Sequence, residues 1–155
     1  MVSVQQFIHV LLIEDDEVDV MGIQREFKKF NLPIYLHVAK NGLEALDMLY
    51  GKNNYPKLLP KPKLIILDIM MPKMDGIKFL QTLRTDPQFN SIKVIVFTTS
   101  NNEADRRAVR DLNITGFFVK NTQFKDFFYT CQSLMKNEPL GKGNNSTSNS
   151  NTTST

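Results

Sequence analysis

The sequence has 155 residues and is poor in the residue types that build many small functional sites, with no tryptophan, one cysteine and two histidines. The single cysteine, Cys131, excludes an internal disulfide and fits a reducing compartment. His9 and His37 are far apart and lie in runs typical of strands, whereas zinc sites and histidine triads need clustered ligands. We therefore expect both histidines to be structural.

Long hydrophobic runs are also missing. No apolar segment approaches the about 20 residues that span a bilayer, and residues 1–7 lack the basic and apolar blocks of a signal peptide. Hydrophobic residues make up 41% of the chain and charged residues 23%, which is typical of one globular domain at this length. The composition predicts a cytoplasmic protein that does not act at a membrane.

The chain has no strong excess of charge of one sign. Its net charge is +3, and the lysines and arginines are spread along the sequence. Modules that bind nucleic acid usually concentrate these residues on one face, so we expect no nucleic-acid partner and no DNA-binding output domain. The densest basic stretch, residues 52–63, contains three prolines. We interpret it as a solvated loop, with a partner-docking patch as the alternative.

Short apolar runs that end in polar residues recur along the chain. Four of them read as buried strands, and a fifth run alternates apolar and polar residues, which is typical of an edge strand. The buried strands are predicted at 8–13, 64–67, 94–97 and 117–119, and the edge strand at 34–39.

The segments between these strands have apolar residues spaced by three or four positions, which predicts helices that bury one face. The spaced residues are Val20, Ile23, Phe27 and Phe30; Leu43, Leu46 and Leu49; Ile77, Leu80 and Leu83; Ala104, Ala108 and Leu112; and Phe124, Phe127, Cys131 and Leu134. Cys131 lies on an apolar face, so we expect it to be an inert core residue. Alternating strands and helices predict a three-layer α/β fold, with a parallel sheet covered on both faces.

The alternating pattern stops near the C-terminus. From Glu138 onward the sequence is dominated by Asn, Ser, Thr and Gly and offers almost nothing to bury. We therefore predict one domain over residues 1–137 and a disordered polar tail over residues 138–155.

The reactive side chains of the sequence follow the predicted strands. Glu14 and Asp15 come after the first strand, Asp68 after the third, Thr98 after the fourth and Lys120 after the fifth. In open α/β sheets ligands bind beyond the carboxyl ends of the strands, at the point where the strand order reverses. If the carboxylates converge there, they repel one another and need a cation. Mg²⁺ is the suitable ion, because it prefers carboxylates, water and phosphate oxygens.

A carboxylate beside such a metal can attack phosphorus and form an acyl phosphate, and Asp68 is our candidate nucleophile. The metal, the Lys120 ammonium and the Thr98 hydroxyl would then neutralise the charge on the transferred oxygens. The competing interpretation is that an acid after a strand only caps the next helix, and this applies above all to residues 14–16.

The segment 68–76, DIMMPKMDG, resembles the D-x-x-M-P-x-M-D-G signature of the response-regulator receiver family at every fixed position. The resemblance also includes the acidic pair Glu14 and Asp15, Thr98 and Lys120, and it spans residues 8–136.

The resemblance implies a doubly wound, five-stranded parallel sheet in the flavodoxin-like (CheY-like) order 2-1-3-4-5. It also implies that Asp68 is the phosphoacceptor and that Mg²⁺ is held by Asp15, Asp68 and the main-chain carbonyl of Met70, with Glu14 acting through water. Asp16 lies one place beyond the acidic pair and is interpreted as a helix cap or an outer acid.

The family resemblance also implies the reaction and its readout. A sensor histidine kinase or a histidine phosphotransfer protein donates the phosphoryl group, and the module turns over no metabolite, so we do not expect a metabolic enzyme. Thr98 then moves toward the phosphoryl group, Phe117 turns inward, and the surface of helix 4, strand 5 and helix 5 changes. The alternatives are that Phe117 is plain core, and that the chain is a scaffold without a switch.

Three further features of the sequence lead to expectations. Phe117 has no hydroxyl, so its ring should either point inward already or be covered by a second chain in a homodimer. Asn121 stands where the family usually has a proline after a cis bond, so the Lys120–Asn121 peptide is either cis and strained, or trans with a different approach of Lys120. The loop 51–63 and the segment 96–100 resemble single-domain receivers that are paired with phytochrome-type sensor kinases.

Overall fold

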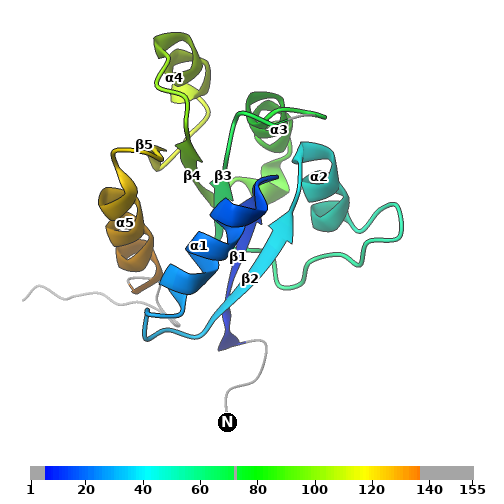
Figure 1. The fold of residues 1–155 in the computed structure, drawn as a ribbon. Coiled ribbons are helices and arrows are strands. Elements are labelled where there is room, and N and C mark those ends of the chain that lie inside the picture. The colour runs from blue at the N-terminus through cyan, green and yellow to red at the C-terminus, as the bar shows by residue number, and fades with distance from the viewer. Residues whose placement is uncertain (1–5, 72, 137–155) are drawn as a thin grey trace, which may run out of the picture.

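Five parallel strands form the centre of the fold, in the order β2-β1-β3-β4-β5 (Figure 1). The computed structural model describes residues 6–71 and 73–136. The strands are β1 (Ile8–Ile13), β2 (Ile34–Ala39), β3 (Leu64–Leu67), β4 (Lys93–Thr98) and β5 (Gly116–Val119). The strand order implied by the family resemblance is confirmed, and each predicted strand overlaps the observed one.

Helices cover both faces of the sheet, as the alternating pattern predicts (Figure 1). Helices α1 (Glu17–Phe27) and α5 (Phe124–Lys136) lie on one face. Helices α2 (Gly42–Tyr50), α3 (Gly76–Leu83) and α4 (Glu103–Arg110) lie on the other, and a short 3-10 helix, η2 (Pro87–Phe89), precedes β4. The three-layer arrangement leaves the carboxyl ends of the strands open along one edge of the sheet.

The core consists of two layers because successive residues of a strand point to opposite faces. Val10 and Leu12 of β1 pack with α1 and α5, whereas Leu11 and Ile13 pack with α2, α3 and α4. Cys131 of α5 is fully buried in the first layer, and burial raises the pKa of its thiol, as expected for an inert core residue.

Three details of the predicted helices are wrong. Leu43 of α2 and Phe124 of α5, which were placed on buried faces by their spacing, are 49% and 43% exposed. Ala104 and Ala108 of α4 are exposed, and Val109 is the buried residue of this helix. Alanine buries too little surface to decide which face of a helix turns inward, so neighbouring contacts of α4 decide it. Helix α1 ends at Phe27, three residues before Phe30, and the Phe30 ring stacks on that of Phe27 with the centroids 5.2 Å apart.

The turn after β3 packs tightly against the start of α3. Asp75 caps α3 by accepting a hydrogen bond from the amide of Lys78 at 2.9 Å. A Cβ atom at Gly76 would lie 2.5 Å from the Cα of Ile69 and 2.6 Å from the carbonyl oxygen of Asp68. Only glycine allows the two backbone segments to approach this closely, so Gly76 fixes the end of β3 where Asp68 stands.

Within residues 6–71 and 73–136, no helix is long and apolar enough to cross a membrane. The polar tail predicted for residues 138–155 lies outside the described residues.

Candidate phosphoacceptor and metal site

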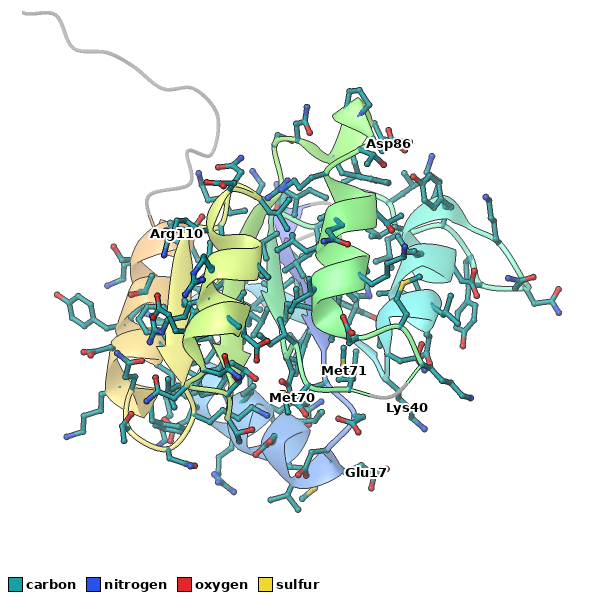
Figure 2. The ribbon with its side chains drawn as sticks, turned by 90° about the horizontal axis from the view of Figure 1, so that it is seen from above. Glu17, Lys40, Met70, Met71, Asp86 and Arg110 are labelled. Atoms are coloured by element: carbon teal, nitrogen blue, oxygen red, sulfur yellow. The ribbon has the colours of Figure 1, made fainter. Side chains whose placement is uncertain are left out.

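The residues singled out at the strand ends lie together along one edge of the sheet. One carboxylate oxygen from each of Glu14, Asp15 and Asp68 lies within 4.8 Å of the others. Glu14 and Asp68 are buried, and Asp15 is exposed. Figure 2 looks down on this edge and shows Met70 in the turn after β3, between α3 and the start of α1. The sequence therefore identified side chains that the fold brings into one cluster.

The Asp68 carboxylate is held by three donors. Its Oδ1 accepts hydrogen bonds from the Thr98 hydroxyl at 2.8 Å and from the Met70 amide at 2.9 Å. Its Oδ2 accepts one from the Lys120 ammonium at 3.1 Å. Thr98 is fully buried. The carboxylate is thus oriented by a hydroxyl, an amide and a cation.

The Lys120 ammonium lies among three carboxylates. Its Nζ is 2.7 Å from Glu14 Oε1, 2.6 Å from Asp19 Oδ2 and 3.1 Å from Asp68 Oδ2. Burial alone would lower the pKa of Lys120, but the hydrogen bonds to Asp19 and Glu14 and the charge of Asp68 outweigh it and raise this pKa. The ammonium therefore stays charged, and each of its three N–H groups has an acceptor.

The peptide bond between Lys120 and Asn121 is trans. Of the two possibilities raised by Asn121, the structure has the unstrained one, and Lys120 still reaches Asp68. Its main chain is held by a hydrogen bond from its amide to the Thr98 carbonyl at 2.8 Å.

Asp16 and Asp19 have separate roles in the first turn of α1. The Asp16 side chain caps the helix by accepting hydrogen bonds from the amides of Val18 and Asp19 at 2.9 and 3.4 Å, as the cap interpretation expects. Asp19 was not predicted as a site residue. It lies in the first turn of α1, but so does Glu17, so no local signal in the sequence separates the two acids.

The site carries more negative than positive charge. Four acids lie at the site, Glu14, Asp15, Asp19 and Asp68, and the Lys120 ammonium contacts all of them except Asp15. Burial, together with repulsion from Asp68, raises the pKa of Glu14 to about 7. The hydrogen bond from Lys120 lowers this pKa but does not outweigh burial. A divalent cation would relieve this repulsion, and the all-oxygen donor set suits a hard ion such as Mg²⁺ or Mn²⁺.

A chain of contacts leads from the site to α4 and β5. The Ser100 amide donates to the Thr98 hydroxyl oxygen at 3.4 Å, and the Ser100 hydroxyl donates to Asp105 Oδ2 at 2.6 Å. The next residue of α4, Arg106, places its guanidinium carbon 4.4 Å from the centroid of the Phe117 ring. The sequence reasoning did not find this chain.

The Phe117 ring lies partly inward. It is half-buried against the core layer of α2, α3 and α4, and Arg106 of the same chain covers it. A cation over the ring face shields apolar surface without a second chain. Covering of the ring by a second chain stays a prediction.

A doubly wound sheet whose strand ends bring together three acids, a threonine and a lysine defines the receiver class of signalling module. The sequence profile described as "Response regulator receiver domain" matches residues 10–131. The chain belongs to the response regulator receiver domain family.

Similar proteins include response regulators with solved structures. Response regulator Rcp1 of Synechocystis sp. is 33% identical over 125 residues, which cover 81% of this chain and 84% of Rcp1. The Mn²⁺-bound structure of Rcp1 matches with a TM-score of 0.72 at 30% identity, covering 88% of this chain and 99% of the Rcp1 chain.

Two other solved structures support the same fold. A two-component response regulator from Legionella pneumophila is 43% identical with a TM-score of 0.70, covering 81% of this chain and 98% of its own. The phosphorylated cyanobacterial phytochrome response regulator RcpA is 28% identical with a TM-score of 0.73, covering 84% and 92%. The resemblance to receivers of phytochrome systems is confirmed.

Proposed function

We propose that the protein accepts a phosphoryl group on Asp68 from a phosphohistidine of a sensor histidine kinase or a histidine phosphotransfer protein. The observation that carries this proposal is the Asp68 carboxylate, which Thr98 and Lys120 orient from two sides next to Glu14 and Asp15. A carboxylate that only stabilised the fold would not need two further acids within reach of one metal ion.

The metal that we propose is Mg²⁺, held by Asp15, Asp68 and the main-chain carbonyl of Met70, with Glu14 acting through water. The support is the oxygen-only donor set and the excess of negative charge around Lys120. The relative Rcp1 has been solved with Mn²⁺ bound, so a divalent ion occurs in a similar protein. When bound, the ion supplies charge neutralisation to the phosphoryl oxygens.

In the proposed transfer, an oxygen of Asp68 attacks phosphorus, the P–O bond forms, and the P–N bond to the donor imidazole breaks. The imidazole leaves with the electron pair of that bond. Lys120 donates to one phosphoryl oxygen, and the Thr98 hydroxyl donates to another. Both groups already contact the Asp68 carboxylate. Each therefore needs to move only from a carboxylate oxygen to an oxygen of the phosphoryl group that is attached to this carboxylate.

We propose that the readout uses the surface of α4, β5 and α5. Thr98 is linked to α4 through Ser100 and Asp105, and Arg106 links α4 to Phe117 of β5. A shift of the Thr98 hydroxyl toward the phosphoryl group changes the first of these links, and α4 transmits the change to the ring. Phosphorylation acts here by favouring one of two arrangements with different contacts.

A homodimer through this surface stays a prediction. Because Arg106 covers Phe117, exposure of this ring no longer argues for it, and charged residues at the rim of the surface remain as possible contacts. Sedimentation of the unmodified protein, with and without fluoroberyllate and Mg²⁺, tests it. A monomer at tens of micromolar in both conditions would leave a different protein as the target.

The proposed function is tested by incubation with acetyl phosphate and Mg²⁺, followed by measurement of the intact mass. We expect the mass to rise by one phosphoryl group in the wild-type protein and to stay unchanged in Asp68→Asn. A wild-type protein that gains no mass would favour the alternative, a scaffold that has kept the fold without the switch.

A further inference from the structure

Asp19 is the least expected member of the site. Its Oδ2 lies 2.6 Å from the Lys120 ammonium, the shortest of the three contacts that this group makes. It does not belong to the cluster of Glu14, Asp15 and Asp68 whose oxygens lie within reach of one metal ion. Asp19 therefore holds the ammonium from α1, in a contact separate from the cluster that would bind the metal.

Lys120 and Asp19 differ in burial, so the contact runs from a buried ammonium to a more exposed carboxylate. The Lys120 side chain is 9% exposed and that of Asp19 is 36% exposed. Both line a hollow beside α1 and α5, together with Phe97, Thr99 and other residues. The ammonium thus lies between two buried acids on its inner side and one half-exposed acid on its outer side.

The inner contacts of Lys120 must change during the proposed reaction, whereas the outer one need not. An acyl phosphate at Asp68 would replace a carboxylate oxygen by phosphoryl oxygens as the acceptor, and Glu14 would turn toward a bound ion. Asp19 would take part in neither event. It would be the partner of the ammonium that stays the same from the resting state to the phosphorylated state.

A lysine side chain needs such a partner because it has four flexible bonds, and ordering it costs conformational entropy. The main chain of Lys120 is already held by the Thr98 carbonyl at 2.8 Å. A second anchor at the ammonium would keep the charge close to the phosphoryl position while its inner hydrogen bonds exchange.

We propose that Asp19 is a positioning residue for phosphoryl transfer, which anchors the Lys120 ammonium beside Asp68 throughout the reaction. This inference rests on the proposed function of Asp68. Asp19 contacts no reacting atom and acts through Lys120 alone.

The first test compares Asp19→Asn with Glu17→Gln at saturating Mg²⁺ and measures the rate of phosphorylation by acetyl phosphate. Both substitutions remove one negative charge from the first turn of α1, and Glu17 is exposed at the helix start (Figure 2). We expect Asp19→Asn to slow the reaction by about three- to tenfold, which is less than the full loss of a charged hydrogen bond because Asp19 is partly exposed. Glu17→Gln should change the rate by less than about twofold. Equal effects in the two variants, or no effect in either, would overturn the inference.

The second test asks whether Asp19 acts through Lys120. In a Lys120→Met background the additional substitution Asp19→Asn should leave the residual rate unchanged. A further slowing in the double variant would mean that Asp19 contributes by another route, which contradicts a positioning role.

The third test does not depend on phosphorylation. In a proton–nitrogen correlation spectrum of the lysine ammonium groups, Lys120 should give a separate resonance because all its N–H groups have acceptors, and Lys120→Arg should remove it. Asp19→Asn should shift or broaden this resonance, and Glu17→Gln should not.

If the wild-type protein takes up no phosphoryl group, the proposed function fails while this spectrum still tests the anchor. A missing resonance, or one unchanged in Asp19→Asn, contradicts the anchor even if Asp68 is phosphorylated.

Discussion

The two halves of the site are held by different kinds of contact. The acidic half, Glu14, Asp15 and Asp68, follows β1 and β3, which pair with each other at the centre of the sheet. The α4–β5 half consists of the contacts that lead from Thr98 through Asp105 and Arg106 to Phe117. It involves β5, which is an edge strand, and α4, which has a single buried residue.

This difference separates the chemistry from its readout. Central strands packed on both faces hold the carboxylates in place, so the reacting groups are rigid. The α4–β5 half depends on side-chain hydrogen bonds and one cation–ring contact, each of which can be broken at small cost. A switch needs such a region, because a modification can shift only an element with two arrangements close in free energy. The predictions below start with the acidic half and end with the α4–β5 half.

Binding of Mg²⁺ should give the largest change in stability. The ion relieves repulsion between the acids and binds the folded state, so at 100 times its Kd it should raise the free energy of unfolding by about 2.7 kcal/mol. Thermal unfolding with increasing Mg²⁺ measures this gain. Asp15→Asn serves as the control and should lose most of it. An unchanged melting temperature for the wild-type protein would argue against a metal site in the acidic half.

Asp15 and Asp16 form a matched pair of adjacent acids. Asp15→Asn should slow phosphorylation at limiting Mg²⁺ by about 10- to 100-fold because it weakens metal binding. Asp16→Asn should leave most of the rate, because Asp16 caps α1 and asparagine is an equally good cap. Rates with acetyl phosphate measure both. An equal loss in the two variants would mean that the metal-binding pair is Asp15 and Asp16, one residue later than proposed.

Two glycines test how tightly the end of β3 is held. Gly76→Ala should lower the free energy of unfolding by about 1–3 kcal/mol because the new methyl group meets the backbone of Asp68 and Ile69. Gly22→Ala, inside α1, meets only the end of the Arg25 side chain at 3.9 Å and should stabilise the protein by about 0.5–1 kcal/mol. Urea unfolding of both variants gives the comparison. Similar changes in both would show that the turn at Gly76 can relax.

The smallest effect is expected in the α4–β5 half. Arg106→Ala removes the cation over the Phe117 ring and should cost about 0.5–1 kcal/mol of stability, whereas Arg107→Ala, at an exposed neighbour, should stay within about 0.5 kcal/mol. Urea unfolding measures both. If Arg106→Ala matches Arg107→Ala, the ring is held by its own packing and not by α4.

The same division explains what the sequence could predict. The strands were identified because buried parallel strands are continuous apolar runs, and the acidic half was identified because its acids directly follow two of these runs and the segment 68–76 marks Asp68. The side chains that link Lys120 to α1 and Phe117 to α4 could not be read in this way. Asp19 and Lys120 are 101 residues apart, and nothing local distinguishes Asp19 from Glu17 in the same helical turn.

The wrong face assigned to α4 has a related cause. Ala104 and Ala108 have the spacing of a buried face but little surface to bury, so the helix instead orients Asp105 toward Ser100 and Arg106 toward Phe117. These polar and cation–ring contacts depend on the assembled sheet, and they carry no periodic signal in the sequence.

The most direct test of the account is to locate the phosphoryl group. The protein is phosphorylated with acetyl phosphate and Mg²⁺ and reduced with borohydride, which converts an aspartyl phosphate to homoserine, and its peptides are then mapped by mass. We predict homoserine at position 68 in the wild-type protein and at no other position, with none in samples that contain a chelator instead of Mg²⁺. Homoserine at Asp15 or Asp19 but not at Asp68, or modification that is equally strong without the metal, would contradict the account.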